Sequence, residues 1–153
     1  MTGYLSFREL PLLLELFERV KAAGRMAEVV MVDGSGILHP RGAGVATHLG
    51  IVARWPTIGV TKTHLQGTLQ DQPSERLPVV AMHDGEQLVG WAIRPVPSRD
   101  ALLYVSPGHR TDVAFARDAV LPTLLGRKLP EPIYWADRLS REEARRIKRN
   151  HPS

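Results

Sequence analysis

The chain is organised around residues 29–41, which read Val-Val-Met-Val-Asp-Gly-Ser-Gly-Ile-Leu-His-Pro-Arg. Their first four residues are apolar and predict a buried strand, which stops at Asp33 and two glycines. A strand that ends in a carboxylate places that acid at the carboxyl edge of a sheet, where open α/β folds bind their ligands. The glycines allow backbone or substrate to come close, and His39 and Arg41 follow within reach. The segment therefore predicts an α/β fold with an acidic site at one sheet edge.

The residues that follow predict a second strand parallel to the first. Residues 45–54 have the apolar spacing of a short helix, and after Pro56 comes an apolar strand at 57–61. Strand, helix and strand within about 35 residues predict a crossover between two parallel strands. Lys62 directly follows the second strand. We therefore expect Lys62 at the same sheet edge as Asp33.

An amphipathic helix is predicted at the start of the chain. Ser6 and Glu9 have the spacing of a capping box, which is one explanation for Glu9. The ring of Pro11 would crowd the carbonyl four residues before it, so we expect the regular helix to begin near Leu10. Gly24 is expected to end this helix.

The remainder of the chain predicts antiparallel strands and two further helices. Asp84-Gly85 between two apolar runs is a strong hairpin signal. The expected elements are a polar loop (66–78), a hairpin (79–83 and 86–93), a strand (102–105), a turn (106–110), a helix from Thr111 or Asp112 to about Leu125, an extended segment (129–132) and a basic helix opened by a capping box at Ser140 and Glu143.

Composition limits the class of protein. With 153 residues and 43% hydrophobic content, residues 1–153 are expected to form one domain, with a basic tail over about 140–153. The net charge of +4 is compatible with a polyanionic partner. The chain has no cysteine, which excludes disulfides and thiolate metal sites. It has no apolar run near the ~20 residues of a membrane span and no signal-peptide pattern. We expect a cytoplasmic protein without a membrane partner.

Two carboxylates are candidates for a metal site. Asp33 is either an aspartate that hydrogen-bonds within its own turn or an acid of the site at the sheet edge. Glu9 is either the capping residue or a second metal ligand. If the first helix packs near the end of the Asp33 strand, both could face one cation, and oxygen ligands of this kind suit magnesium or manganese. Lys62 is either an exposed loop lysine or a group that stabilises charge on a phosphate.

Histidine and arginine recur after small-residue turns. His39 is followed by Arg41, and His109 by Arg110. Each histidine is either a hydrogen-bonded turn residue or a contact with phosphate, and the neighbouring arginines strengthen the second interpretation. His48 and His64 are expected to have no part in the site. Asp137 is either an acid at the start of a helix or a third metal carboxylate. The basic tail is either a solvated helix face or a surface that attracts phosphates without sequence preference.

Five motifs, taken in order, resemble the endonuclease V family. Each would be a weak match alone, but together they cover residues 3 to about 138. The motifs are Leu-Ser-Phe-Arg-Glu, Val-Asp-Gly-Ser-Gly-Ile-Leu-His-Pro-Arg-Gly-Ala-Gly-Val-Ala-Thr-His-Leu-Gly, Pro-Thr-Ile-Gly-Val-Thr-Lys, Tyr-Val-Ser-Pro-Gly-His-Arg and Leu-Pro-Glu-Pro.

This resemblance implies a ribonuclease H-like mixed sheet flanked by helices. It implies magnesium-dependent cleavage (manganese may substitute) of DNA, and in some members RNA, at inosine. The cut falls at the second phosphodiester bond on the 3′ side. The resemblance gives catalytic roles to Glu9, Asp33, His39 and Lys62 and metal-binding roles to Glu9, Asp33 and Asp137. It gives nucleic-acid contacts, including the pocket for a flipped base, to Tyr4, Gly34, Gly36, Arg41, His109 and Arg110.

At its amino-terminal end the sequence departs from the family pattern. Family members normally carry three antiparallel strands before the first helix, and an aspartate in the first of them completes the metal site. The expectation is an N-terminally shortened member with an exposed edge on the Asp33 strand and weakened cleavage. Only Met1-Thr2-Gly3-Tyr4 is expected to remain of the wedge segment. Neither Asp71 nor Asp84 is expected to replace the missing acid. The alternative is a nucleic-acid-binding remnant without metal chemistry.

Overall fold

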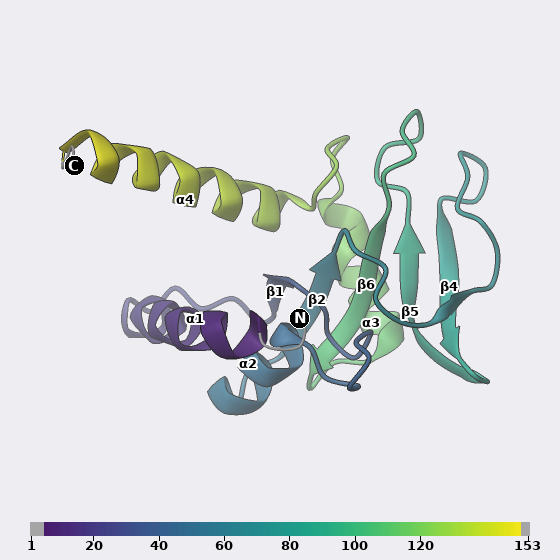
Figure 1. Cartoon of the computed structure of the whole chain (residues 1–153), viewed down its shortest axis with the longest axis horizontal. Coiled ribbons are helices and arrows are strands. Elements are labelled where there is room, and N and C mark those ends of the chain that lie inside the picture. The colour runs from purple at the N-terminus through teal and green to yellow at the C-terminus, as the bar shows by residue number, and fades with distance from the viewer. Residues whose placement is uncertain (1–4, 151–153) are drawn as a thin grey trace.

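A six-stranded mixed sheet forms the centre of the computed structural model, which describes residues 5–150 (Figure 1). The strand order is β1-β2-β6-β5-β4-β3. Along the chain the elements are α1 (Leu5–Ala22), β1 (Val30–Asp33), α2 (Val45–Ala53), β2 (Thr57–Thr61), β3 (Thr68–Leu69), β4 (Val79–Asp84), β5 (Gln87–Ile93), β6 (Leu103–His109), α3 (Val113–Val120), the 3-10 turn η2 (Leu121–Thr123) and α4 (Glu131–Asn150).

The parallel pair predicted from the sequence is confirmed. β1 lies beside β2 in parallel, with Asp33 in register with Val60. The other neighbouring strands pair antiparallel. The hairpin around Asp84-Gly85 joins β4 to β5, and Gly85 adopts a φ of +60° in its turn. The α/β class with a mixed sheet flanked by helices is therefore the fold of this chain.

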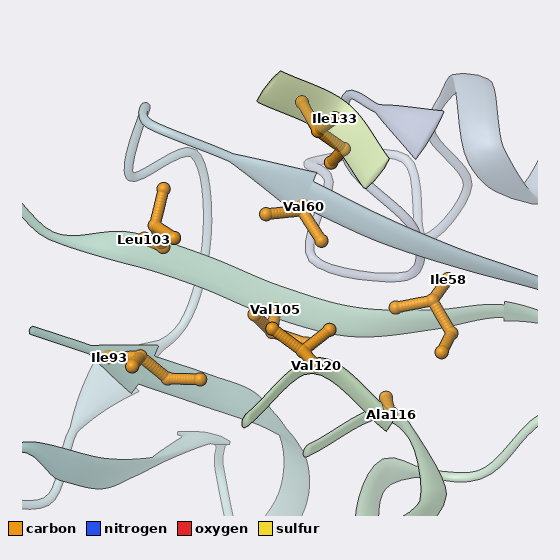
Figure 2. Close-up of a cluster of buried hydrophobic side chains, with 8 residues drawn as sticks. All are labelled: Ile58, Val60, Ile93, Leu103, Val105, Ala116, Val120 and Ile133. Atoms are coloured by element: carbon orange, nitrogen blue, oxygen red, sulfur yellow. The ribbon is translucent and has the colours of Figure 1, made fainter. Parts of the chain in front are cut away.

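Helices cover both faces of the sheet. On one face, α1 and α2 pack on β1 through a cluster built around Val32, Val45 and Leu49. On the other face, α3 and the first turn of α4 pack on the central strands, as Figure 2 shows. That larger cluster consists of Ile58, Val60, Ile93, Leu103, Val105, Ala116, Val120 and Ile133. None of the helices within residues 5–150 is long and apolar enough to cross a membrane.

The expectation that α1 begins near Leu10 is wrong. The helix begins at Leu5 and runs through Pro11. Proline removes one helical hydrogen bond, but most of the stability of a helix in a protein comes from packing of its apolar face. Leu13 and Leu14 supply that packing against α2 and β1. Gly24, with a φ of +67°, follows the helix end as predicted.

The turn predicted at residues 106–110 is also wrong. β6 continues through these residues to His109. Pro107 cannot donate a ladder hydrogen bond, and a register shift between Thr57 and Ile58 of β2 lies opposite it. Irregularities of this kind are where a sheet accepts proline. His109 is thereby carried to the far end of β6.

α4 corrects two further expectations. It begins at Glu131, inside the segment predicted to be extended, and runs without interruption to Asn150. Ser140 therefore lies within the helix, where its hydroxyl donates to the carbonyl of Asp137 (2.8 Å) instead of capping a new helix. By contrast, the predicted cap Asp112 is confirmed, since its side chain accepts from the amide of Phe115 (2.7 Å).

Candidate functional site

The carboxyl ends of β1 and β2 bring Asp33 and Lys62 to one edge of the sheet. Asp33 is the last residue of β1, and Lys62 follows β2 two residues beyond Val60, the register partner of Asp33. Strand geometry places their Cα atoms about 8 Å apart. Both residues are exposed. A phosphate at this edge could therefore meet a carboxylate and an ammonium group together.

Asp137 approaches this edge from the face covered by α4. Ile133, one helical turn earlier, is buried in the same cluster as Val60, and Met31 packs against that cluster. Strand alternation puts Asp33 on the same face of β1 as Met31. Asp137 is half-exposed, and its Oδ1 accepts from Nε of Arg141 (3.0 Å). Asp137 therefore lies on the helix that borders the site, and its carboxylate is ion-paired with Arg141.

Glu9 comes from the opposite layer. It is exposed in α1, next to Leu10, which packs against the cluster of Val32 and Val45. Figure 1 shows the amino-terminal end of α1 directed towards the sheet. Glu9 thus directly precedes the residues through which α1 packs on this cluster.

The candidate carboxylates differ in how well they fit a metal ion. Within the described part of the chain, no three His, Cys, Asp or Glu residues form a group that could hold one. Glu9, Asp33 and Asp137 are therefore not gathered into a closed site. Magnesium accepts one or two carboxylates and completes its shell with water and phosphate oxygens. Asp33 fits that chemistry, while Asp71 and Asp84 follow or end strands on the far side of the sheet.

The loop after Asp33 is held against the sheet by a buried hydroxyl. Ser106 Oγ accepts from the amides of Gly36 (3.2 Å) and Leu38 (3.4 Å), and the amide of Gly34 donates to the carbonyl of Val60 (2.9 Å). Ser106 is only 1% exposed. The sequence does not reveal this role, because Ser106-Pro107-Gly108 is typical of a turn.

Gly34 and Gly36 have a packing role. A Cβ on Gly34 would lie 2.2 Å from Cγ1 of Val45, and one on Gly36 would lie 2.0 Å from the carbonyl oxygen of Pro107. Only glycine allows the loop to pass this close to α2 and β6. The predicted contacts of these glycines with nucleic acid stay a prediction, and Tyr4 lies outside the described residues.

His39 lies in an electropositive part of the loop. Its Nδ1 accepts from the amide of Arg41 (3.2 Å). Burial lowers the pKa of His39, and the positive charges of Arg41 and His48 lower this pKa further. The neutral imidazole is thereby favoured near pH 7. His48, which the sequence did not single out, contributes to this environment.

We expect His39 to make the fold less stable at acidic pH. Its pKa is lowered from 6.5 in the folded chain, so the unfolded chain binds more protons as the pH falls below 6.5. Between about pH 7.5 and about pH 5.5, His39→Gln should lose less stability than the wild type in urea unfolding. Arg41→Gln should lie between the two. If the free energy of unfolding depended on pH identically in the wild type and His39→Gln, the lowered pKa of His39 would be contradicted.

His109 and Arg110 lie away from the Asp33 edge. His109 pairs with Thr57, the first residue of β2, whereas Lys62 follows the last. The intervening strand separates these ends by about 13 Å. The guanidinium of Arg110 donates to the carbonyl of Arg54 (3.0 Å) and so braces the end of α2. The structure does not bring this pair to the site, and its nucleic-acid contacts stay a prediction.

An aromatic pair that sequence reasoning missed lies beside Lys62. Tyr104 pairs with Thr61 at the end of β2, and its ring stacks on that of His64 with centroids 5.1 Å apart. Nε2 of His64 hydrogen-bonds to the carbonyl of Gly67 (2.8 Å). Burial raises the pKa of Tyr104, which keeps its phenol neutral. Only the pairing of β2 with β6 reveals this contact.

Comparison with known sequences identifies relatives along most of the chain. A family profile described as Endonuclease V matches residues 1–138. The chain is 42% identical over 138 residues to Endonuclease V of Xanthomonas axonopodis pv. citri, a match that covers 90% of this chain and 56% of that protein. For Endonuclease V of Ignicoccus hospitalis, the identity is 41% over 145 residues, with 95% and 63% covered. The chain thus spans less than two thirds of these relatives.

Solved structures show the same fold. The catalytic domain of human Endonuclease V superposes with a TM-score of 0.84 at 35% identity, over 96% of this chain and 65% of that one. Endonuclease V of Ciona intestinalis, in complex with a 24mer DNA containing an inosine followed by a ribo-adenosine, gives a TM-score of 0.81 at 27% identity, over 96% and 67%. Both agree with the mixed sheet and flanking helices described above.

Proposed function

This chain belongs to the endonuclease V family, and on that premise we propose that it is a magnesium-dependent endonuclease acting on DNA that contains inosine. The observation that carries the proposal is the placement of Asp33 and Lys62 at adjoining strand ends within residues that match the family. The DNA-bound relative from Ciona intestinalis supports inosine-containing DNA as the substrate. A role in repair of deaminated bases, with manganese able to replace magnesium, completes the proposal.

Each residue of the site has a distinct proposed role. Asp33 would hold Mg²⁺, with Glu9 and Asp137 as further carboxylates reached directly or through water. When bound, the ion would activate the attacking water and neutralise charge on the leaving oxygen. Lys62 would offset the charge of the scissile phosphate. His39 is held neutral by its surroundings and its Nδ1 accepts from the Arg41 amide, so its Nε2–H would donate a hydrogen bond to that phosphate.

The position of the cut follows from the family resemblance and is part of the proposal. We infer cleavage at the second phosphodiester bond on the 3′ side of inosine, leaving 3′-hydroxyl and 5′-phosphate ends. RNA containing inosine is a further candidate substrate. A cytoplasmic location stays a prediction from the sequence.

Cleavage of a labelled oligonucleotide tests the proposal. With Mg²⁺, the protein is expected to cut an inosine-containing strand at this bond and to leave the matched strand with adenine intact. EDTA should abolish cutting. Equal cutting of both strands, or cutting that survives EDTA, would rule out the proposed activity.

A second candidate function is binding of nucleic acid without cleavage. It is favoured by the lack of a group of three metal-binding side chains within residues 5–150. This alternative predicts salt-sensitive binding that does not depend on Mg²⁺. The same oligonucleotides, incubated with and without Mg²⁺, separate the two functions, because only the first yields a product.

A further inference from the structure

The last turns of α4 carry most of the excess positive charge of the protein. Residues 139–150 contain five basic and two acidic side chains, an excess of three within a net charge of +4. The match to the family profile ends at residue 138, just before this stretch. Figure 1 shows the helix projecting from the sheet towards the carboxyl terminus. The excess positive charge therefore lies on the projecting end of α4.

Ion pairs along α4 neutralise some of its arginines and leave others available. Three pairs lie within the helix: Arg138 with Glu142, Arg141 with Asp137, and Arg146 with Glu143. Arg145, Lys148 and Arg149 are exposed, and among residues 5–150 no carboxylate lies within 4.0 Å of any of them. We call these three residues the basic face.

The spacing of the basic face places its three charges together. Arg145, Lys148 and Arg149 stand at positions i, i+3 and i+4, which are neighbours on the surface of a helix. Like charges at this spacing repel one another. A polyanion in contact with the face would relieve that repulsion and release its own counterions.

Aromatic contacts brace the base of α4. Ile133 is buried in the core, and Nε1 of Trp135 donates to Oε2 of Glu131 (2.8 Å). The guanidinium of Arg127 lies 4.1 Å from the centroid of the Tyr134 ring. Ile133 packs the first turn of the helix on the sheet, and the other contacts tie this turn together and to Arg127. The basic face therefore projects from a base that is held in place.

We propose that the basic face binds the sugar-phosphate backbone of duplex DNA, without sequence preference. This inference rests on the proposed function only in taking DNA as the ligand. A lipid surface fits the helix less well. The apolar row of Trp135, Leu139 and Ile147 is interrupted by Glu143, which is ion-paired with Arg146, whereas membrane-bound helices carry an unbroken apolar face.

The test measures binding of a fluorescein-labelled duplex of about 24 base pairs without inosine, in EDTA, by fluorescence anisotropy. The variant Arg145→Gln/Lys148→Gln/Arg149→Gln should raise Kd about tenfold at about 100 mM salt. The slope of the log of the association constant against the log of the salt concentration is negative. The variant should reduce the magnitude of this slope by about 2 to 3. Glutamine is a good helix former, so circular dichroism should show an unchanged helix content.

The matched control removes three exposed charges elsewhere. Lys21→Gln/Arg25→Gln/Arg76→Gln changes the net charge equally and should alter Kd less than about twofold. If both triple variants weakened duplex binding equally, net charge alone would explain the effect and the proposal would be overturned. A basic-face variant that binds like the wild type, or one impaired only towards phosphatidylserine vesicles, would do the same. Since the duplex lacks inosine, this result is independent of whether the protein cleaves DNA.

Discussion

Replacing Asp33 by Asn is expected to lower the rate of cleavage of inosine-containing DNA in Mg²⁺ by about 100-fold or more. Asp33 is the carboxylate at the end of β1, beside Lys62 at the end of β2. Asparagine keeps the shape of the side chain but removes the charge that attracts a hard cation. Because Asp33 is exposed, the substitution should leave the fold intact. Single-turnover cleavage would measure the fall in rate. A Mn²⁺ titration would measure the loss of metal affinity that the missing charge should cause.

Asp84→Asn is the matched control for this change. Asp84 is an exposed carboxylate that ends β4, separated from β1 by three strands of the sheet. Its substitution should change neither the cleavage rate nor the affinity for Mn²⁺. Glu9→Gln should lower the rate as well if α1 delivers its carboxylate to the same ion. Wild-type cleavage by Asp33→Asn would show that the site has been placed wrongly.

A methyl group added at Gly59 is expected to cost about 3 kcal/mol or more of the free energy of unfolding. Gly59 is buried in β2 beneath the loop that follows Asp33. A Cβ there would lie 2.1 Å from the amide nitrogen of Gly36 and 2.7 Å from the carbonyl oxygen of Gly34. Both atoms belong to the backbone, so no side-chain rotation relieves the contact. The loop would have to lift from the sheet, and cleavage should fall together with stability.

Gly126→Ala provides the comparison. A Cβ at Gly126 meets nothing within 4 Å, and the cost of the change comes only from the positive φ of 83°. That strain amounts to about 1 kcal/mol. Urea unfolding of both variants measures the difference. If Gly59→Ala were no less stable than Gly126→Ala, the close packing of the loop on β2 would be refuted.

Local signals in the sequence were sufficient for much of the fold. The apolar runs on either side of a short helix predicted the parallel pair of β1 and β2, and the hairpin at Asp84-Gly85 followed from turn chemistry. The same reasoning placed Asp33 and Lys62 at one edge. These predictions hold because strand direction and turn type are set by residues that are close together in the chain.

Other features depended on contacts between distant residues. Pro107 and Gly108 are typical of a turn, yet pairing with β2 extends the strand through them to His109. Ser140 has the spacing of a helix cap, but the helix had already begun at Glu131. In each case the local preference is worth about 1 kcal/mol, which packing and ladder hydrogen bonds exceed.

Periodicity and strand ends thus established a mixed α/β domain with an aspartate and a lysine at one edge of its sheet. Folding in three dimensions set the positions of the other site residues. In the folded chain His109 lies at the opposite end of the sheet and Ser106 lies under the loop. His39 lies near the positive charges of Arg41 and His48. The reason is physical: periodicity reports which face of an element is buried, whereas the partner of a polar group depends on residues as many as 70 positions away.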